Sequence, residues 1–242
     1  MKCLDKLLPA MTALALLLAV PYLLVKTGAW EPGAPASSNG SSTLPTRDPD
    51  DLPVINRIDD FSMIDQSGRI VRRDDLLGQV WLADVIFTRC PGPCAKMTSR
   101  MADLQASIPP EWPVKLVSLT TDPEHDTPEV LNRYATRFQA DAGRWSFLSA
   151  AKPAIVDLAV GNLKLVMLDK DESRESPEDL FIHSTTLALV DKRGRLRGAF
   201  ESLPTDVSKF DGFEDVGPPV DNWQSELKPR VLKAIERLVA ED

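Results

Sequence analysis

Runs of apolar residues alternate with amphipathic stretches along the chain from Val54 onward. Two of these runs, 80–87 (VWLADVIF) and 114–120 (VKLVSLT), are nearly continuous, which is typical of strands buried on both faces of a sheet. The stretch 61–71 (FSMIDQSGRIV) predicts a β-hairpin that turns at residues 66–68. The other strands that the pattern predicts are 163–169, 184–191 and the RLRGAF stretch that follows a Lys-Arg-Gly turn.

Three stretches have the spacing of apolar positions that is typical of helices. The first follows the 80–87 run and places Met97, Met101 and Leu104 on one face. The second begins at Asp126-Thr127-Pro128-Glu129, where a capping side chain, an early proline and an acid mark a helix start. The third, RVLKAIERLVAED, closes the chain. Strand–helix–strand followed by hairpin–helix predicts an α/β fold, with a mixed sheet flanked by helices on both faces.

The N-terminal pattern is different in kind. Residues 7–25 carry no charged side chain and are bracketed by Lys6 and Lys26, which is close to the roughly 20 apolar residues that span a bilayer. A cleavable signal sequence is the alternative, but its apolar region is usually shorter and ends at a small-residue cleavage site. Lys2 and Lys6 favour a cytoplasmic N-terminus. We therefore expect a transmembrane anchor at 7–25 in a bacterial inner membrane, single-pass, with the globular domain in the periplasm.

The expected domain organisation follows from these segments. Residues 1–6 form a short cytoplasmic N-terminus, and residues 26–53, rich in Pro, Ser, Gly and Asp, form a flexible tether. Residues 54–242 form one globular domain, which outside the cytoplasm can hold an oxidised cysteine pair. The formal net charge of −8 argues against a nucleic-acid partner, because little in this chain would neutralise phosphates.

Cys90 and Cys94 are the cysteines of the globular body, and they directly follow the first buried strand. Residues four apart lie on one face of a helical turn, so the two sulfurs can converge to disulfide distance. Cys94 is expected in the first helical turn, where exposed N–H groups and the helix dipole favour a thiolate. A cysteine motif between a central strand and its helix is where a thioredoxin-like fold carries its chemistry, so we expect that fold. Cys3, before the anchor, is taken as an inert thiol.

The cysteine pair is compatible with a structural disulfide, a redox pair or a metal site. A disulfide that closes a loop of three residues would stabilise the fold little. A zinc site normally has four ligands, and the body holds no further cysteine. Copper(I), in contrast, accepts two thiolates and one imidazole. Met97 and Met101 carry thioethers on the same helical face, but apolar packing accounts for them.

The search for an imidazole is short, because the chain has two histidines. His125 lies in a polar loop among Asp122, Glu124 and Asp126, and its neighbours indicate a solvated side chain. His183 lies at the mouth of a predicted core strand, at one end of the sheet. A lone histidine before an apolar strand is more often structural, and His183 becomes a candidate ligand because two converging thiolates need a third partner.

Three motifs carry a resemblance: VWLADVIFTRCPGPC, SLTTDPEHDTPEVLNRYATRF and FIHSTTLALVDKRGRLRGAF. In this order and at these distances, between about Phe61 and Phe200, the chain resembles the Sco/SenC family of membrane-anchored, thioredoxin-like copper proteins. The resemblance implies a metallochaperone, in preference to an enzyme, that delivers a copper ion during assembly of the dinuclear copper centre of cytochrome c oxidase. Its partner would be the oxidase subunit that carries that centre.

The resemblance also implies which residues act. The copper ligands would be Cys90, Cys94 and His183. An acidic residue linked to redox behaviour or partner contact would be Asp122, with Asp126 the weaker match.

The chain departs from the family at two positions. Ala95 follows the second cysteine where the family usually has proline, and Ile182 precedes the histidine where an acid is common. Neither change removes a ligand. The stretch 210–223 (FDGFEDVGPPVDNW) matches no family motif that we identify.

Two other functions use the same cysteines. A thiol-disulfide oxidoreductase would reduce a partner's cysteines with Cys90 and Cys94 and would not need His183. Its weakness is the three-residue spacing, since thioredoxins space their redox cysteines by two residues. A thiol peroxidase is disfavoured because the residues around Arg89 and Cys90 do not match the peroxiredoxin motif.

Overall fold

The computed structural model describes residues 52–90, 92–169, 181–183, 185–203 and 220–241, with the backbone alone at 168–169 and 181–183. All of these residues belong to one compact unit. No helix in this described part is long and apolar enough to cross a membrane. The predicted anchor at 7–25 and tether at 26–53 lie outside the described residues.

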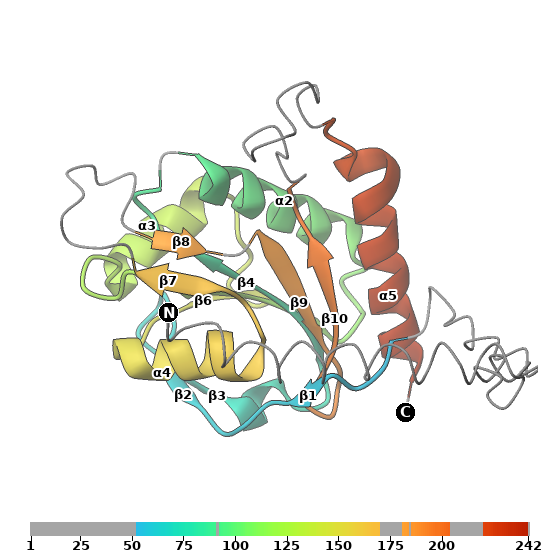
Figure 1. Cartoon of the computed structure of the whole chain (residues 1–242), viewed down its shortest axis with the longest axis horizontal. Coiled ribbons are helices and arrows are strands. Elements are labelled where there is room, and N and C mark those ends of the chain that lie inside the picture. The colour runs from blue at the N-terminus through green and yellow to red at the C-terminus, as the bar shows by residue number, and fades with distance from the viewer. Residues whose placement is uncertain (1–51, 91, 170–180, 184, 204–219, 242) are drawn as a thin grey trace, which may run out of the picture. The chain divides into compact units, whose positions relative to one another are not determined.

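A six-stranded mixed sheet forms the centre of the body, with the order β1-β10-β9-β4-β5-β6 (Figure 1). β4, β5 and β6 run parallel to one another, and β9 pairs antiparallel with β4. Two small antiparallel sheets, β2–β3 and β7–β8, complete the strands of the described part. The strands are β1 (Asn56–Arg57), β2 (Ser62–Ile64), β3 (Ile70–Arg72), β4 (Val80–Ile86), β5 (Val114–Thr120), β6 (Trp145–Leu148), β7 (Met167–Asp169), β8 (Phe181–His183), β9 (Thr186–Val190) and β10 (Arg195–Glu201).

Helices cover both faces of the sheet, as the sequence predicts. Alternate residues of β4 point into two separate hydrophobic clusters, so this strand is buried on both faces. One cluster lies under α2, α3 and α5, and the other lies under α4 and the β2–β3 hairpin (Figure 1). The helices are α2 (Pro93–Ser107), α3 (Pro128–Arg137), α4 (Lys152–Val156) and α5 (Lys228–Ala240), with a 3₁₀ turn η1 (Arg73–Leu76) and π-helical turns η2 (Asp157–Asn162) and η5 (Trp223–Leu227).

The strand predicted over 163–169 is wrong in its first half. The π-helical turn η2 runs up to this segment, and Lys164 has a positive φ of 59°. Leu163 and Leu165 are buried in the second cluster without belonging to a strand. Their apolar pattern therefore reflects packing, and only Met167–Asp169 pairs as a strand.

Met97 and Met101 are fully buried on the inner face of α2. Met101 contributes to the cluster that lies under α2, α3 and α5. The prediction that these methionines serve packing is consistent with this burial.

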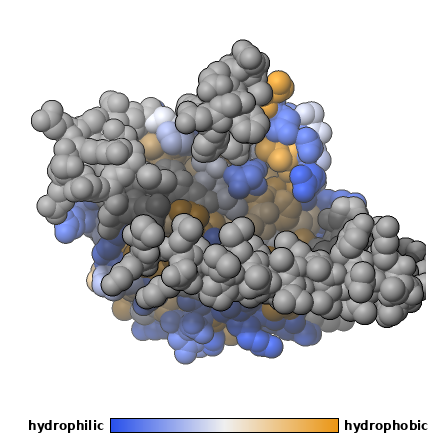
Figure 2. All heavy atoms as spheres, viewed as in Figure 1, coloured by the Kyte–Doolittle hydropathy of each residue, from blue (hydrophilic) through white to orange (hydrophobic). Residues whose placement is uncertain are grey.

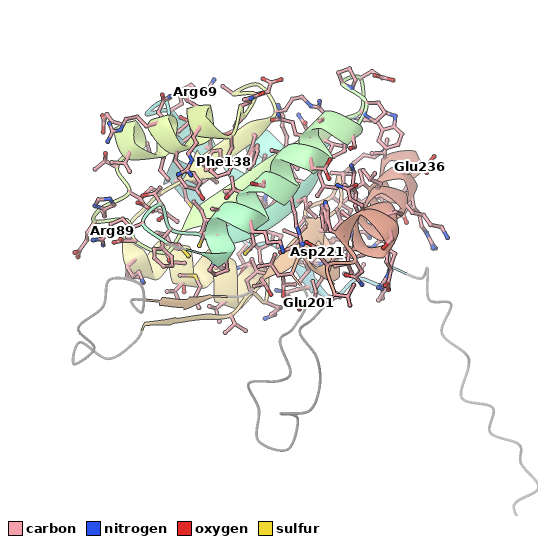
Figure 3. All side chains as sticks on the ribbon, turned by 90° about the horizontal axis from the view of Figure 1, so that it is seen from above. Arg69, Arg89, Phe138, Glu201, Asp221 and Glu236 are labelled. Carbon is pink, nitrogen blue, oxygen red and sulfur yellow. The ribbon has the colours of Figure 1, made fainter. Side chains whose placement is uncertain are left out.

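Four residues, two at the end of the stretch 210–223 and two after it, hold the side of α2 that faces α5; we call Asp221, Trp223, Gln224 and Lys228 the C-terminal clasp. Asp221 accepts ion pairs from Lys96 at 2.9 Å and Arg100 at 2.6 Å, and lies between α2 and α5 in Figure 3. Three clasp side chains donate to the carboxylate of Asp103: Trp223 at 2.8 Å, Gln224 at 2.9 Å and Lys228 at 2.6 Å. Residues 210–219 of the stretch lie outside the described part.

Arg197 in β10 joins the two ends of the described body. Its guanidinium donates to the carbonyl of Leu52 at 2.7 Å and to both carboxylate oxygens of Glu241, at 2.6 and 3.0 Å. It also donates to Asp191 at 2.9 Å.

The described surface at the lower edge of Figure 2, where β2, β3 and η1 lie in Figure 1, is mostly hydrophilic.

Candidate metal and redox site

The cysteine loop connects the carboxyl end of β4 to the start of α2. After β4 ends at Ile86, the amide of Cys90 donates to the carbonyl of Phe87 at 3.1 Å, which turns the chain. Gly92 caps α2 with φ −141° and ψ −89°, and Pro93 takes the first helical turn, where no N–H donor is needed. Cys94 therefore lies in the first turn, as the sequence predicts.

The two cysteines lie together but in different environments. Cys94 is fully buried, whereas Cys90 is half-buried, and no disulfide joins them. A hydrogen bond with Cys90 and burial together raise the pKa of the Cys94 thiol far above its ordinary range. The expectation that the helix start favours a Cys94 thiolate is therefore wrong, because the hydrogen bond with Cys90 and burial outweigh the backbone contact at Phe87 that lowers this pKa.

Polar groups beneath the pair tie α2 to α3. The hydroxyl of Thr98 donates to the carbonyl of Cys94 at 2.8 Å and lies 3.0 Å from the hydroxyl of Tyr134. Burial raises the pKa of Tyr134 above its ordinary value, and the nearby cysteines and the buried Asp84 of β4 add to that shift. These groups fix the first turn of the helix that carries Cys94.

Asp122 lies beside the cysteine loop and is paired with Arg89. The guanidinium of Arg89 donates to Asp122 Oδ2 at 2.5 and 3.2 Å, and Asp122 is only 6% exposed. Figure 3 shows Arg89 at the end of the molecule where α2 begins. The acid selected from the family resemblance therefore lies next to the residue that precedes Cys90.

Asp126 has contacts that were not predicted from the sequence. It is fully buried and accepts hydrogen bonds from Thr88 and Thr120. Thr88 lies two residues after the end of β4, and Thr120 is the last residue of the neighbouring parallel strand β5. Thr120 is in register with Ile86, so the two threonines lie at one edge of the sheet. Polar residues at the carboxyl ends of adjacent parallel strands are a signal that could have indicated this cluster.

The backbone of His183 ends β8, where it is in register with Met167 of β7. Figures 1 and 3 both place β8 at the end of the body where α2 begins. The side chain of His183 lies outside the described part. Among the described side chains, no three of His, Cys, Asp and Glu are grouped to hold a metal ion. His125 is exposed, as expected for a solvated loop residue.

Comparison with known proteins decides the family. The sequence profile described as SCO1/SenC matches residues 53–209, which is more than half of the chain. The chain belongs to the SCO1/SenC family. The SCO1 protein homolog of Bacillus subtilis (strain 168) is 32% identical to it over 178 residues, covering 73% of this chain and 83% of the relative.

Solved SCO1/SenC structures share the fold. A SCO1/SenC family lipoprotein from Bacillus anthracis matches with a TM-score of 0.59 and 25% identity, over 77% of this chain and 96% of that one. BsSco, described as a Sco family cytochrome c oxidase assembly protein with a disulfide switch, matches with a TM-score of 0.53 and 29% identity, over 62% and 86%. Arabidopsis thaliana ScoI, determined with copper bound, matches with a TM-score of 0.56 and 20% identity, over 74% and 98%.

Proposed function

We propose that this protein binds copper through Cys90, Cys94 and His183 and delivers it during assembly of the dinuclear copper centre of cytochrome c oxidase. The observation that carries the proposal is the adjacency of the two sulfurs at the start of α2. Two thiolates and one imidazole suit copper(I), which prefers soft ligands. Copper is the cargo of this site, so it must both enter and leave.

Relatives support the copper assignment and the receiving partner. Arabidopsis ScoI, which shares the fold, was determined with copper bound. BsSco is named as a member of the cytochrome c oxidase assembly proteins. We infer that the receiving partner of this chain is the oxidase subunit that carries the dinuclear copper centre.

We also infer that the body is held at a membrane. Residues 7–25 would serve as the anchor and residues 26–53 as the tether, placing residues 54–242 in the periplasm of a bacterial cell. The Bacillus anthracis relative is named as a lipoprotein, which is consistent with attachment to a membrane. Separating membranes from soluble protein after lysis tests this: full-length chain belongs in the membrane fraction, and a chain that begins at residue 26 does not.

A thiol-disulfide oxidoreductase is the second candidate, and one observation favours it. Cys90 is half-buried and Cys94 fully buried, which suits an attacking thiol followed by a resolving thiol. Cys90 would attack a partner disulfide, and Cys94 would release the reduced partner by closing the Cys90–Cys94 disulfide. Both functions need the reduced dithiol, so the contribution of His183 separates them.

The deciding experiment is an anaerobic copper(I) titration of the reduced full-length protein in detergent, against a competing chelator. Cys90→Ser and His183→Ala should each weaken one-to-one binding by at least about tenfold, since each removes one ligand of three. His125→Ala is the matched control and should bind like the parent, because His125 is exposed in a loop. Binding that is indifferent to His183→Ala would contradict the copper site and favour the oxidoreductase.

A further inference from the structure

The carboxyl group of Asp126 is a hydrogen-bonding centre for the segments around the cysteines. Its Oδ2 accepts from the amide of Thr88 at 3.1 Å and from the hydroxyl of Thr120 at 2.5 Å. Its Oδ1 accepts from the hydroxyl of Thr88 at 2.5 Å. The carboxyl group is fully buried, so these protein donors replace the water that it would otherwise bind.

These bonds link two segments that are distant in the sequence, the loop around Thr88 and residues 120–126. Thr88 lies two residues before Cys90, and Thr120 ends β5. The hydroxyl of Thr120 also accepts from the amide of Asp122 at 3.0 Å, and the amide of Asp126 donates to the carbonyl of Asp122 at 2.9 Å. The same network therefore holds the cysteine loop and the acid that pairs with Arg89.

The cysteine loop depends on such support because of its composition. Pro91 and Pro93 have no N–H group, so this part of the chain has few backbone donors. The first half of the loop is held by the bond from Thr88 to Asp126 and by the bond from Cys90 to Phe87. A buried carboxylate that receives an amide and two hydroxyl groups is a strong anchor for such a loop.

We propose that Asp126 is a positioning residue that, through Thr88, holds Cys90 beside Cys94. It touches neither sulfur in this role and is not a ligand. Both states that need converging sulfurs, the copper complex and the disulfide, gain from a loop that is already ordered, because less conformational entropy is lost when they form. The copper part of this inference rests on the proposed function, whereas the disulfide part does not.

The test measures two constants on the full-length protein in detergent. The first is the equilibrium constant for oxidation of the cysteine pair by glutathione disulfide: Cys90–SH + Cys94–SH + GSSG gives the Cys90–Cys94 disulfide + 2 GSH. In this reaction the protein loses two electrons and two protons to glutathione. The second is the copper(I) affinity. Asp126→Ala should lower each constant by about tenfold, as expected for the loss of hydrogen bonds to a charged group. Thr88→Val, which keeps the amide bond, should lower each by about threefold.

Asp126→Asn serves as the rescue variant. Its carbonyl oxygen can accept from the Thr88 amide and the Thr120 hydroxyl, while its NH₂ group donates to the Thr88 hydroxyl. Both constants should therefore stay within about threefold of the parent. Asp191→Ala is the matched control, since Asp191 is also a buried aspartate that accepts from backbone amides, but beyond β9. It should destabilise the fold without moving either constant.

The outcomes separate this inference from the proposed function. If the parent binds no copper, the proposed function fails, but a disulfide constant that is lowered in Asp126→Ala and Thr88→Val and not in Asp191→Ala still supports positioning. Constants within twofold of the parent in both Asp126→Ala and Thr88→Val would overturn the inference. So would an equal shift in Asp191→Ala, because the effect would then be one of general stability. If Asp126→Ala does not fold, the comparison of Thr88→Val with Asp191→Ala decides.

Discussion

At the scale of single residues, Cys90 and Cys94 differ in access and in their environment. Cys94 is buried against β4 and α3, and its thiol has a raised pKa because of the hydrogen bond with Cys90 and its burial. Cys90 is half-buried at the surface of the loop. Cys90 is thus the thiol that a copper donor or a partner disulfide meets first.

Alkylation kinetics test this difference. Limiting iodoacetamide, added to the reduced protein at pH 7.5, should label Cys90 at least about tenfold faster than Cys94, since the thiolate is the reacting form and Cys94 is buried and protonated. Peptide mass spectrometry with fragmentation locates the label. Equal labelling of the two cysteines in the folded protein would contradict the described geometry, and denatured protein, in which the rates should converge, is the control.

At the scale of elements, the C-terminal clasp fixes α2 along the side that faces α5. Trp223 is only 5% exposed and belongs to the cluster under α2, α3 and α5. The guanidinium of Arg100 lies 5.0 Å from the centre of its ring, and the indole N–H donates to Asp103. The helix that carries Cys94 therefore depends on residues that lie 120 to 125 positions after their partners in α2.

Trp223→Ala should lower the free energy of unfolding by about 3 kcal/mol, because it leaves a cavity where a large aromatic side chain was buried. Chemical denaturation monitored by circular dichroism measures the change. Trp112→Ala is the control, since Trp112 packs against the same cluster but is only partly buried, and it should cost clearly less. Similar losses in the two variants would mean that the clasp adds no particular stability to α2.

The elements that could be predicted are those whose own residues specify them. The runs at β4 and β5 are continuous and apolar, and both strands are found within one residue of the predicted bounds. The short β6 and the π-helical turn η2 were missed, since four residues give little periodicity and a π turn has no simple apolar pattern. These elements are specified by packing against the rest of the sheet.

The candidate site likewise has one part that is specified by neighbouring residues and one part that only the folded sheet brings together. The cysteine pair and the helix start are encoded in adjacent residues, so their arrangement could be predicted. The bonds from Thr88 and Thr120 to Asp126 join residues that lie 38 and 6 positions apart, and the first of these depends on how β4 pairs with β5. Only the folded sheet brings those side chains together.

At the scale of the whole molecule, an ion network at the edge of the sheet makes stability depend on pH. Burial alone would raise the pKa of Asp191, but hydrogen bonds from Arg197, from Arg195 and from backbone amides outweigh it and leave that pKa below its ordinary value. A carboxyl group with a lowered pKa in the folded state stabilises the fold above its unfolded pKa, near 4, and loses that contribution as the pH falls through its folded value.

Asp191→Asn should therefore cost about 2 kcal/mol of unfolding free energy at pH 7, the scale of hydrogen bonds to a buried charged group. The difference from the parent should begin to shrink below about pH 4, where the carboxyl group of the unfolded chain becomes protonated, and should be lost once the pH passes the lower pKa of the folded state. Urea denaturation at pH 7, 4 and 3 measures it. A difference that stays constant over this range would show that the charge of Asp191 is not what stabilises the network.

The contacts of Arg197 have a practical consequence for handling the protein. Because one side chain binds both the carbonyl of Leu52 and the carboxylate of Glu241, the described body begins and ends at the same place. That place is at β10, two strands away from β4, whose carboxyl end leads to the cysteines. A bead, a sensor surface or a fluorescent label joined to either end would therefore leave the body in nearly the same orientation, with its cysteine loop equally open to solution. Joining the two ends through a short linker is a direct route to a circularly permuted variant with new termini elsewhere on the surface.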